Sequence, residues 1–463
     1  PPGLPVRATH GNQLSGDEPH YLVTAVSLEE DLDLDVSDEM AAERYRAFHA
    51  QGLRSQAARQ PSGRMVVPHD PLLPAVLALP VRLAGWVGAK LTLAAVNGVL
   101  AGLLVWVAVR RLAVPRGTAA LTAALFGASA PLAVYGHQVY PELPAGLAVA
   151  VAVAVLTGAL RPGGLVAFVV AVVALPWLSV KYVGVAAAIT VLGFLRLLRR
   201  GRRRTAVVVA GVLLAAGLVH VVAHLTWYGG LTVYAAGEFF AEHGGQLSVT
   251  GTAPQLWGRA RRLVGLLVDR QFGLAAWQPA WLLAVPALAG LARRRPDRAL
   301  TLGLPLATGW LTATFLALTM QGWWFPGRQV VVVLPAAAVA VAWWTGGDRR
   351  RVALLAITGS VGVASYGHLV AEGLGRELTW VVDFAATSNP WYRTWRWALP
   401  NYLEVTWATW ALHVAWSAVA VVLVGWGWRG ARYGVGAPVA PPAVARSSGS
   451  RASGTFWNVS PPE

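Results

Sequence analysis

Residues 205–227 have the sequence TAVVVAGVLLAAGLVHVVAHLTW, an apolar stretch without a single Asp, Glu, Lys or Arg. A helix needs about 20 apolar residues to cross the hydrocarbon core of a bilayer, and this stretch supplies them. The whole 463-residue chain has the same character, because 56% of its residues are hydrophobic and only 13% are charged. This composition excludes a soluble globular protein of this size and predicts an all-α polytopic membrane protein.

Apolar segments of comparable length recur along the chain. We expect about eleven membrane spans, at 90–109, 118–135, 139–160, 163–180, 183–198, 205–227, 272–292, 299–320, 328–345, 352–370 and 410–428. Arg clusters lie at alternate ends of these spans, for example at Arg110-Arg111 and Arg349 to Arg351. The positive-inside rule assigns those ends to the cytoplasm, so the net charge of +16 reflects topology and does not indicate binding to nucleic acid.

This topology divides the chain into three regions. Residues 1–89 form a first extracytoplasmic loop, with amphipathic interfacial helices expected at 22–34 and 40–60. Residues 90–428 form a transmembrane helical domain with outer loops 228–271 and 371–409. Residues 429–463 are rich in Pro, Gly, Ser and Ala, which is typical of a disordered cytoplasmic tail.

An odd number of spans that starts outside predicts a helix before residue 1, hence about twelve spans in the full protein. The first residues, Pro1 to Pro5, carry neither a start Met nor a signal segment, which agrees with this expectation. A chain rich in Ala, Val, Arg and Gly with only two lysines, Lys90 and Lys181, indicates a bacterial source. We therefore expect a multi-pass protein of the bacterial cytoplasmic (inner) membrane.

A short stretch of charged and aromatic residues, Asp17-Glu18-Pro19-His20-Tyr21, precedes the first spans. Adjacent carboxylates beside a histidine at a bilayer edge suit proton transfer or cation binding. The alternative is an acidic loop in which Glu18-Pro19 starts a helix. Pro68-His69-Asp70-Pro71-Leu72 ends the same loop, so Asp17, Glu18, His20 and His69 could also hold a divalent cation, although their spacing is not diagnostic. No Cys is present, so a thiolate metal site is excluded.

Three other stretches place polar groups at the outer ends of spans. Tyr140-Pro141-Glu142 presents a carboxylate held between prolines, and the alternative is a solvated loop acid. Lys181-Tyr182 follows a Pro-broken segment, and a lone Lys there could instead snorkel to the interface. Trp323-Trp324 forms an aromatic wall before Arg328, whose guanidinium suits a phosphate.

These motifs resemble a known group. Asp17-Glu18-Pro19-His20-Tyr21 followed by Pro68-His69-Asp70-Pro71-Leu72 is similar to the Asp-Glu-x-His-aromatic and His-Pro-Pro-Leu pair of the protein O-mannosyltransferase family. More broadly, the chain resembles the GT-C superfamily of membrane glycosyltransferases, which use polyprenyl-phosphate sugars. Asp70 stands where the mannosyltransferase pattern has proline, and the chain has no clear counterpart of that family's large soluble outer domain.

The resemblance implies the chemistry. A sugar would pass with inversion from a polyprenyl phosphate to the hydroxyl of an extracytoplasmic glycan, lipid or protein. Asp17 would act as general base with Glu18 beside it. Substrate contacts are expected from His20, Tyr21, His69, Asp70, Tyr140, Glu142, Lys181, Tyr182, Trp323, Trp324 and Arg328.

Two other classes of function stay open. One is a transporter or flippase for a lipid-linked or envelope precursor, which would depend on polar groups in the middle of the membrane. The other is a membrane-embedded ligase, polymerase or structural component.

Overall fold

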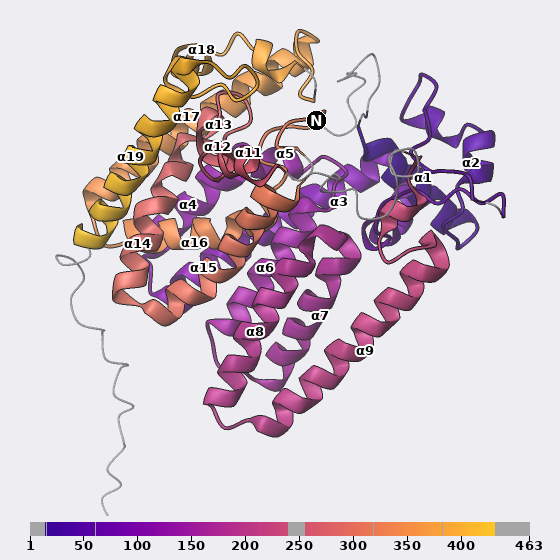
Figure 1. The fold of residues 1–463 in the computed structure, drawn as a ribbon, viewed down its shortest axis with the longest axis horizontal. Helices are drawn as coiled ribbons and strands as arrows, with labels where there is room; N and C mark the ends of the chain where they lie inside the picture. The colour runs from indigo at the N-terminus through magenta and orange to yellow at the C-terminus, as the bar shows by residue number, and fades with distance from the viewer. Residues whose placement is uncertain are drawn as a thin grey trace, which may run out of the picture.

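A computed structural model describes residue 14 and residues 16–60, 62–238, 255–317, 319–381 and 383–430 of the chain. Within these residues the regular structure is helical (Figure 1). Isolated β-bridges join Asp35 to Val66, Ala57 to Gly237 and Arg59 to Met65. The all-α fold is therefore confirmed for this part of the chain. The predicted tail lies outside the described residues from position 431 onward.

The helices of the first half of the chain are α1 (Glu18–Glu30), α2 (Ser37–Ala41), η1 (Arg44–Ala47), α3 (Leu72–Leu112), α4 (Arg116–Gly127), α5 (Leu132–Tyr135), α6 (Glu142–Leu156), α7 (Pro162–Leu178), η2 (Val180–Tyr182), α8 (Val183–Arg199), α9 (Arg203–Tyr228) and η3 (Val233–Ala236). Those of the second half are α11 (Leu256–Ala260), α12 (Arg262–Val268), α13 (Leu274–Trp277), η5 (Pro279–Leu283), α14 (Ala284–Arg294), α15 (Pro296–Leu311), η6 (Thr312–Leu316), η7 (Val331–Val333), α16 (Leu334–Thr345), α17 (Arg349–Gly375), η8 (Phe384–Ala386), α18 (Pro390–Trp395), η9 (Arg396–Ala398) and α19 (Trp407–Gly430).

Six described helical segments are long and apolar enough to cross a membrane: Leu72–Leu112, Val180–Arg199, Arg203–Ala236, Pro296–Leu316, Arg349–Gly375 and Trp407–Gly430. Three shorter apolar helices are Glu142–Leu156, Pro162–Leu178 and Val331–Thr345. The chain is therefore a membrane protein, and the count of about eleven spans stays a prediction.

Two of the predicted spans are interrupted rather than continuous. Segment 118–135 stops at Gly127 and resumes after Pro131 as the short helix α5. Segment 272–292 is divided among α13, η5 and α14, with Pro279 at the start of η5. Proline lacks the N–H that a helix interior requires, which is why both breaks fall beside one.

The helices observed in the first loop differ from the two that the sequence predicted there. Helix α1 starts at Glu18, before the expected residue 22, and most of its side chains are buried, so it is not a surface amphipathic helix. The helix predicted at 40–60 is wrong, because α2 ends at Ala41 and only the short η1 follows. Glu43 between them has a φ of 53°, a left-handed conformation that ends a helix.

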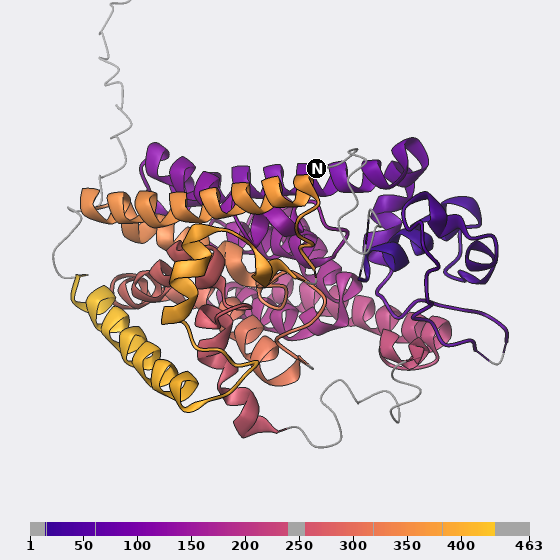
Figure 2. The same ribbon diagram turned by 90° about the horizontal axis from the view of Figure 1, so that it is seen from above.

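Helix α3 begins inside the region assigned to the first loop. It starts at Leu72, breaks at Ala84 and Gly85, and then continues to Leu112. Gly85 has a φ of 57°, which a glycine adopts without a steric penalty. Residues 72–89, which were assigned to the first loop, and the predicted span 90–109 thus belong to one bent element (Figure 2).

The packing separates an interior from a lipid-facing rim. Most residues of α6 and nearly all residues of α16 are buried, whereas only 6% of the apolar window of α19 is buried inside the protein. Helix α19 lies along the outside of the bundle (Figure 2). In the interior, α1 packs on α3, α3 on α6, and α6 on η7. These contacts bring the starts of α1 and α6 close to the segment that precedes η7.

Candidate functional site

Four charged side chains from four separate parts of the chain meet at these helix ends. The Nη2 of Arg328 donates to Oδ2 of Asp17 at 2.6 Å, and its Nε donates to Oε1 of Glu142 at 3.0 Å. The Nζ of Lys181 donates to the same Glu142 oxygen at 2.7 Å. Glu142 is fully buried and the Arg328 side chain is 11% exposed. Two acids and two bases therefore form one buried network, which we call the charge cluster (Asp17, Glu142, Lys181 and Arg328).

Glycines hold both members of the Asp17–Arg328 pair in position. Gly16 and Gly327, which directly precede them, have φ values of 62° and 89°. A Cβ on Gly16 would lie 2.7 Å from the hydroxyl of Tyr140, and one on Gly327 would lie 2.9 Å from Leu274. Because glycine alone adopts these angles freely and leaves this space, both turns depend on it.

Aromatic rings surround the guanidinium of Arg328. It lies 4.3 Å from the ring centroid of Tyr140 and 5.2 Å from that of Trp324, distances at which a cation is attracted to a ring face. Tyr140 also accepts a hydrogen bond from the backbone N–H of Asp17 at 3.2 Å. Tyr21 meets Tyr140 edge to face with ring centroids 6.3 Å apart, and it stacks on His69 with ring centroids 4.3 Å apart.

Glu18 has partners different from those of Asp17. Its Oε1 accepts hydrogen bonds from Nζ of Lys90 at 3.2 Å and from the backbone N–H of Val139 at 2.8 Å. Both side chains of the Glu18–Lys90 pair are buried. The two adjacent carboxylates therefore belong to two separate ion pairs, and Glu18 fastens α1 to α3 and to the segment before α6.

Three buried polar atoms close to the charge cluster have no hydrogen-bond partner among the described residues: Oε2 of Glu142, the hydroxyl of Tyr182 and Nε2 of His69. Buried polar groups in native proteins are nearly always hydrogen-bonded, so each such atom needs an explanation. Together they give the charge cluster hydrogen-bonding capacity that a polar ligand would use.

Electrostatics fix the protonation of the first-loop residues. Burial opposes the charge on Asp17, but Arg328 and His69 outweigh it and hold the pKa of Asp17 well below its ordinary value. Burial, reinforced by His69, lowers the pKa of His20 from 6.5 to about 3. Burial likewise lowers the pKa of His69. At neutral pH, Asp17 is an anion and both imidazoles are neutral.

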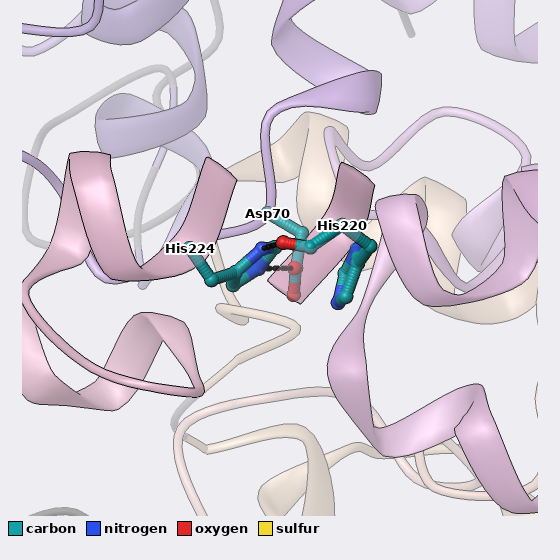
Figure 3. Close-up of side chains that lie close together, drawn as sticks. All are labelled: Asp70, His220 and His224. Carbon is teal, nitrogen blue, oxygen red and sulfur yellow. Dashed lines mark hydrogen bonds and ion pairs between the residues drawn. The ribbon is translucent and has the colours of Figure 1, made fainter. Parts of the chain in front are cut away.

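A second cluster lies beside the first and comprises Asp70, His220 and His224 (Figure 3). Oδ1 of Asp70 lies 2.9 Å from Nε2 of His224, and Oδ2 accepts from the N–H of Val180 at 2.8 Å. Tyr228, one turn after His224, donates its hydroxyl hydrogen to the carbonyl oxygen of His69 at 2.8 Å. Helix α9 is thereby bound to the loop that carries His69 and Asp70.

The structure thus gathers most of the predicted site residues. Those in or around the charge cluster are Asp17, Tyr21, His69, Tyr140, Glu142, Lys181, Tyr182, Trp324 and Arg328. Asp70 belongs to the second cluster, Glu18 bonds Lys90, and His20 is buried in α1. Trp323 is 67% exposed, and its backbone carbonyl lies near Gly16.

Sequence reasoning did not name His220 and His224. Their signal was present, because a His-x-x-x-His spacing inside the apolar stretch 205–227 places both imidazoles on one helix face. The four residues suggested for a divalent cation, Asp17, Glu18, His20 and His69, do not form such a group within the described residues, where the groups found are Asp70–His220–His224 and Asp31–Asp38–Glu39.

Comparisons with protein-family models, with curated proteins and with solved structures found no match to this chain.

Proposed function

We propose that this chain is an integral-membrane glycosyltransferase that moves a sugar, with inversion, from a polyprenyl-phosphate donor to an acceptor hydroxyl. One observation carries the proposal: the buried charge cluster joins an Asp, an Arg and a Lys at one end of an apolar bundle, and Oε2 of Glu142 has no hydrogen-bond partner among the residues that the structure describes. This set supplies a base, cationic phosphate ligands and acceptors for sugar hydroxyls.

Arg328 is the proposed ligand of the donor phosphate. Its Nε and Nη2 hold Glu142 and Asp17, so further N–H groups of the guanidinium stay available to a phosphate oxygen. A leaving phosphate departs as a stable anion and needs positive charge rather than an acid, and Lys181 adds a second cation on the Glu142 side.

An apolar pocket offers a place for the lipid tail. It has a volume of about 450 Å³ and is lined by residues of α12, η5, α14, α15, α16 and α19, together with Leu274 of α13. The Leu274 side chain also packs where a Cβ of Gly327 would lie, one residue before Arg328. The pocket wall therefore extends to the segment that carries the proposed phosphate ligand, as a prenyl phosphate requires.

Asp17 is the proposed general base. In its ion pair with Arg328 it is a weak base, because the guanidinium holds its pKa low. A phosphate that binds Arg328 competes with this carboxylate and raises its basicity. Asp17 then takes the proton of the acceptor hydroxyl, the hydroxyl oxygen bonds to the anomeric carbon, and the bond from that carbon to the phosphate oxygen breaks to release prenyl phosphate.

Two of the buried polar atoms without a partner among the described residues can bind the sugar in this mechanism. Oε2 of Glu142 can accept a hydrogen bond from a sugar hydroxyl, and the hydroxyl of Tyr182, whose ring lies beside Lys181, can donate one. The Arg clusters at alternate span ends support a site on the extracytoplasmic face of a bacterial cytoplasmic membrane. A glycan, lipid or protein outside the cell would then be the acceptor.

The test is to incubate the purified full-length chain, in lipid nanodiscs, with a panel of polyprenyl-phosphate sugars and candidate acceptors, and to measure release of prenyl phosphate. We expect release that depends on the donor and falls strongly in Arg328→Ala, with Arg82→Ala as a surface control. Movement of an intact lipid-linked sugar across a vesicle membrane without any glycosidic bond formation would favour a flippase and refute the transferase.

A further inference from the structure

The second cluster has the make-up of a metal site. It brings one carboxylate and two imidazoles together, with one ligand atom of each within 4.8 Å of the others. Asp70, His220 and His224 are 2%, 8% and 0% exposed. Two of them lie one turn apart on α9, and the third comes from the first loop (Figure 3).

The two ring nitrogens of His224 cannot both make favourable contacts with their neighbours unless a cation lies between His224 and Asp70. Its Nδ1 lies 2.9 Å from the carbonyl oxygen of His220, which can only accept, so Nδ1 carries the hydrogen. In the neutral ring, Nε2 then presents a lone pair to a carboxylate oxygen of Asp70 at 2.9 Å. Two acceptors face each other, and something positive has to lie between them.

A proton is one solution and a metal ion is the other. A proton would give a charged His224 paired with Asp70, which satisfies those two residues only. It leaves Nδ1 of His220, which is buried and lacks a hydrogen-bond partner among the described residues. A divalent ion bound by Nε2 of His224, an oxygen of Asp70 and Nδ1 of His220 satisfies all three.

We propose that Asp70, His220 and His224 bind a divalent transition-metal ion, Zn²⁺. Two imidazoles and one carboxylate form a ligand set that Zn²⁺ uses in proteins, whereas Mg²⁺ and Ca²⁺ prefer oxygen alone. The supporting hydrogen bonds are those of a metal site, since the His220 carbonyl holds the His224 ring and the Val180 N–H holds Asp70.

The ion has a positioning role. It links α9 to the 69–70 loop and, through Val180, to the turn that carries Lys181. The same loop places His69 against Tyr21. The proposal is independent of glycosyl transfer, because it rests on ligand atoms outside the charge cluster and is tested by binding rather than by activity.

The experiment uses the full-length chain, purified in detergent with any affinity tag removed and stripped with a chelator. Zn²⁺ uptake is measured by mass spectrometry of metal content and by competition with a chromophoric chelator. We expect about one Zn²⁺ per chain, with affinity reduced at least about tenfold in His220→Ala and in Asp70→Asn. His368→Ala, which removes a histidine from α17 outside the cluster, leaves affinity unchanged.

Co²⁺ provides a measurement that needs no variant. In the unaltered chain, bound Co²⁺ should give visible absorption of a low-coordinate site with nitrogen ligands, and excess Zn²⁺ should abolish it. Absence of uptake by the unaltered chain overturns the proposal and assigns a shared proton to His224 and Asp70. Equal Zn²⁺ affinity of His220→Ala and the unaltered chain overturns it as well, because the ion then lies elsewhere.

Discussion

Replacement of Lys90 by Met tests the buried Glu18–Lys90 pair. The two side chains are 5% and 11% exposed, and the Lys90→Met change leaves the Glu18 carboxylate buried with only the Val139 N–H as a partner. Loss of one member of a buried ion pair costs about 3–5 kcal/mol of unfolding free energy, and the retained Val139 hydrogen bond places the expected loss near 3 kcal/mol. The double change Glu18→Gln with Lys90→Met removes both charges and should return stability to within about 1 kcal/mol of the unaltered chain.

Unfolding is followed by tryptophan fluorescence in mixed micelles at neutral pH. Arg82→Met is the matched control. Arg82 lies on the same helix and its exposed side chain pairs with the half-buried Glu29 at 3.4 Å; such surface pairs contribute less than about 1 kcal/mol. If Lys90→Met destabilises no more than Arg82→Met, or if the double variant is as unstable as Lys90→Met alone, the reasoning about the buried pair is refuted.

Three further outcomes follow from the geometry. Gly201→Ala should lose about 1 kcal/mol of unfolding free energy, because the φ of Gly201, 69°, is left-handed but its surroundings are open. Gly327→Ala should lose clearly more, because the added Cβ would meet Leu274 and Pro131 at 2.9 Å. Equal losses of the two variants in thermal unfolding would contradict this. His20 binds a proton in the unfolded chain below pH 6.5 but in the folded chain only near pH 3, so the unaltered chain should lose about 2 kcal/mol between pH 7 and pH 5 relative to His20→Asn. An identical pH dependence of the two proteins would rule out His20 as the cause. Tyr182→Phe removes a buried hydroxyl that has no hydrogen-bond partner in the described part of the chain, so stability should stay equal or rise while the KM for the sugar substrate rises. A less stable protein with unchanged KM would assign the hydroxyl a structural role.

The membrane character and the main site segments could be predicted from the sequence. A long apolar stretch identifies a membrane helix without knowledge of its neighbours, because a segment in the bilayer core must be apolar and must satisfy its own backbone hydrogen bonds. The residues Asp17, Glu142, Lys181 and Arg328 were recognisable because charged groups are costly at the ends of membrane spans, and Glu142 also follows a proline that restricts the backbone. Their mutual pairing was not predictable, since it depends on how α1, α6 and the segment before η7 pack.

Three other features could not be predicted, because they depend on contacts between residues that are far apart in the sequence. Glu18 was expected to act with Asp17, but Lys90 lies 72 positions away and binds it. The expected helix at 40–60 does not continue to residue 60, because Ala57 bridges Gly237 and Arg59 bridges Met65. His220 and His224 were visible as a spacing, but their significance appeared only when Asp70 was brought beside them.

Asp17→Asn tests the central claim most directly, through two measurements on one protein: binding of a non-transferable polyprenyl-phosphate sugar and rate of transfer. Asparagine carries no charge and competes more weakly than aspartate with phosphate for Arg328, so we predict donor binding at least as tight as in the unaltered chain. Loss of the base should reduce transfer by about 100-fold or more. Full transfer by Asp17→Asn, or donor binding that weakens in step with transfer, would contradict the account.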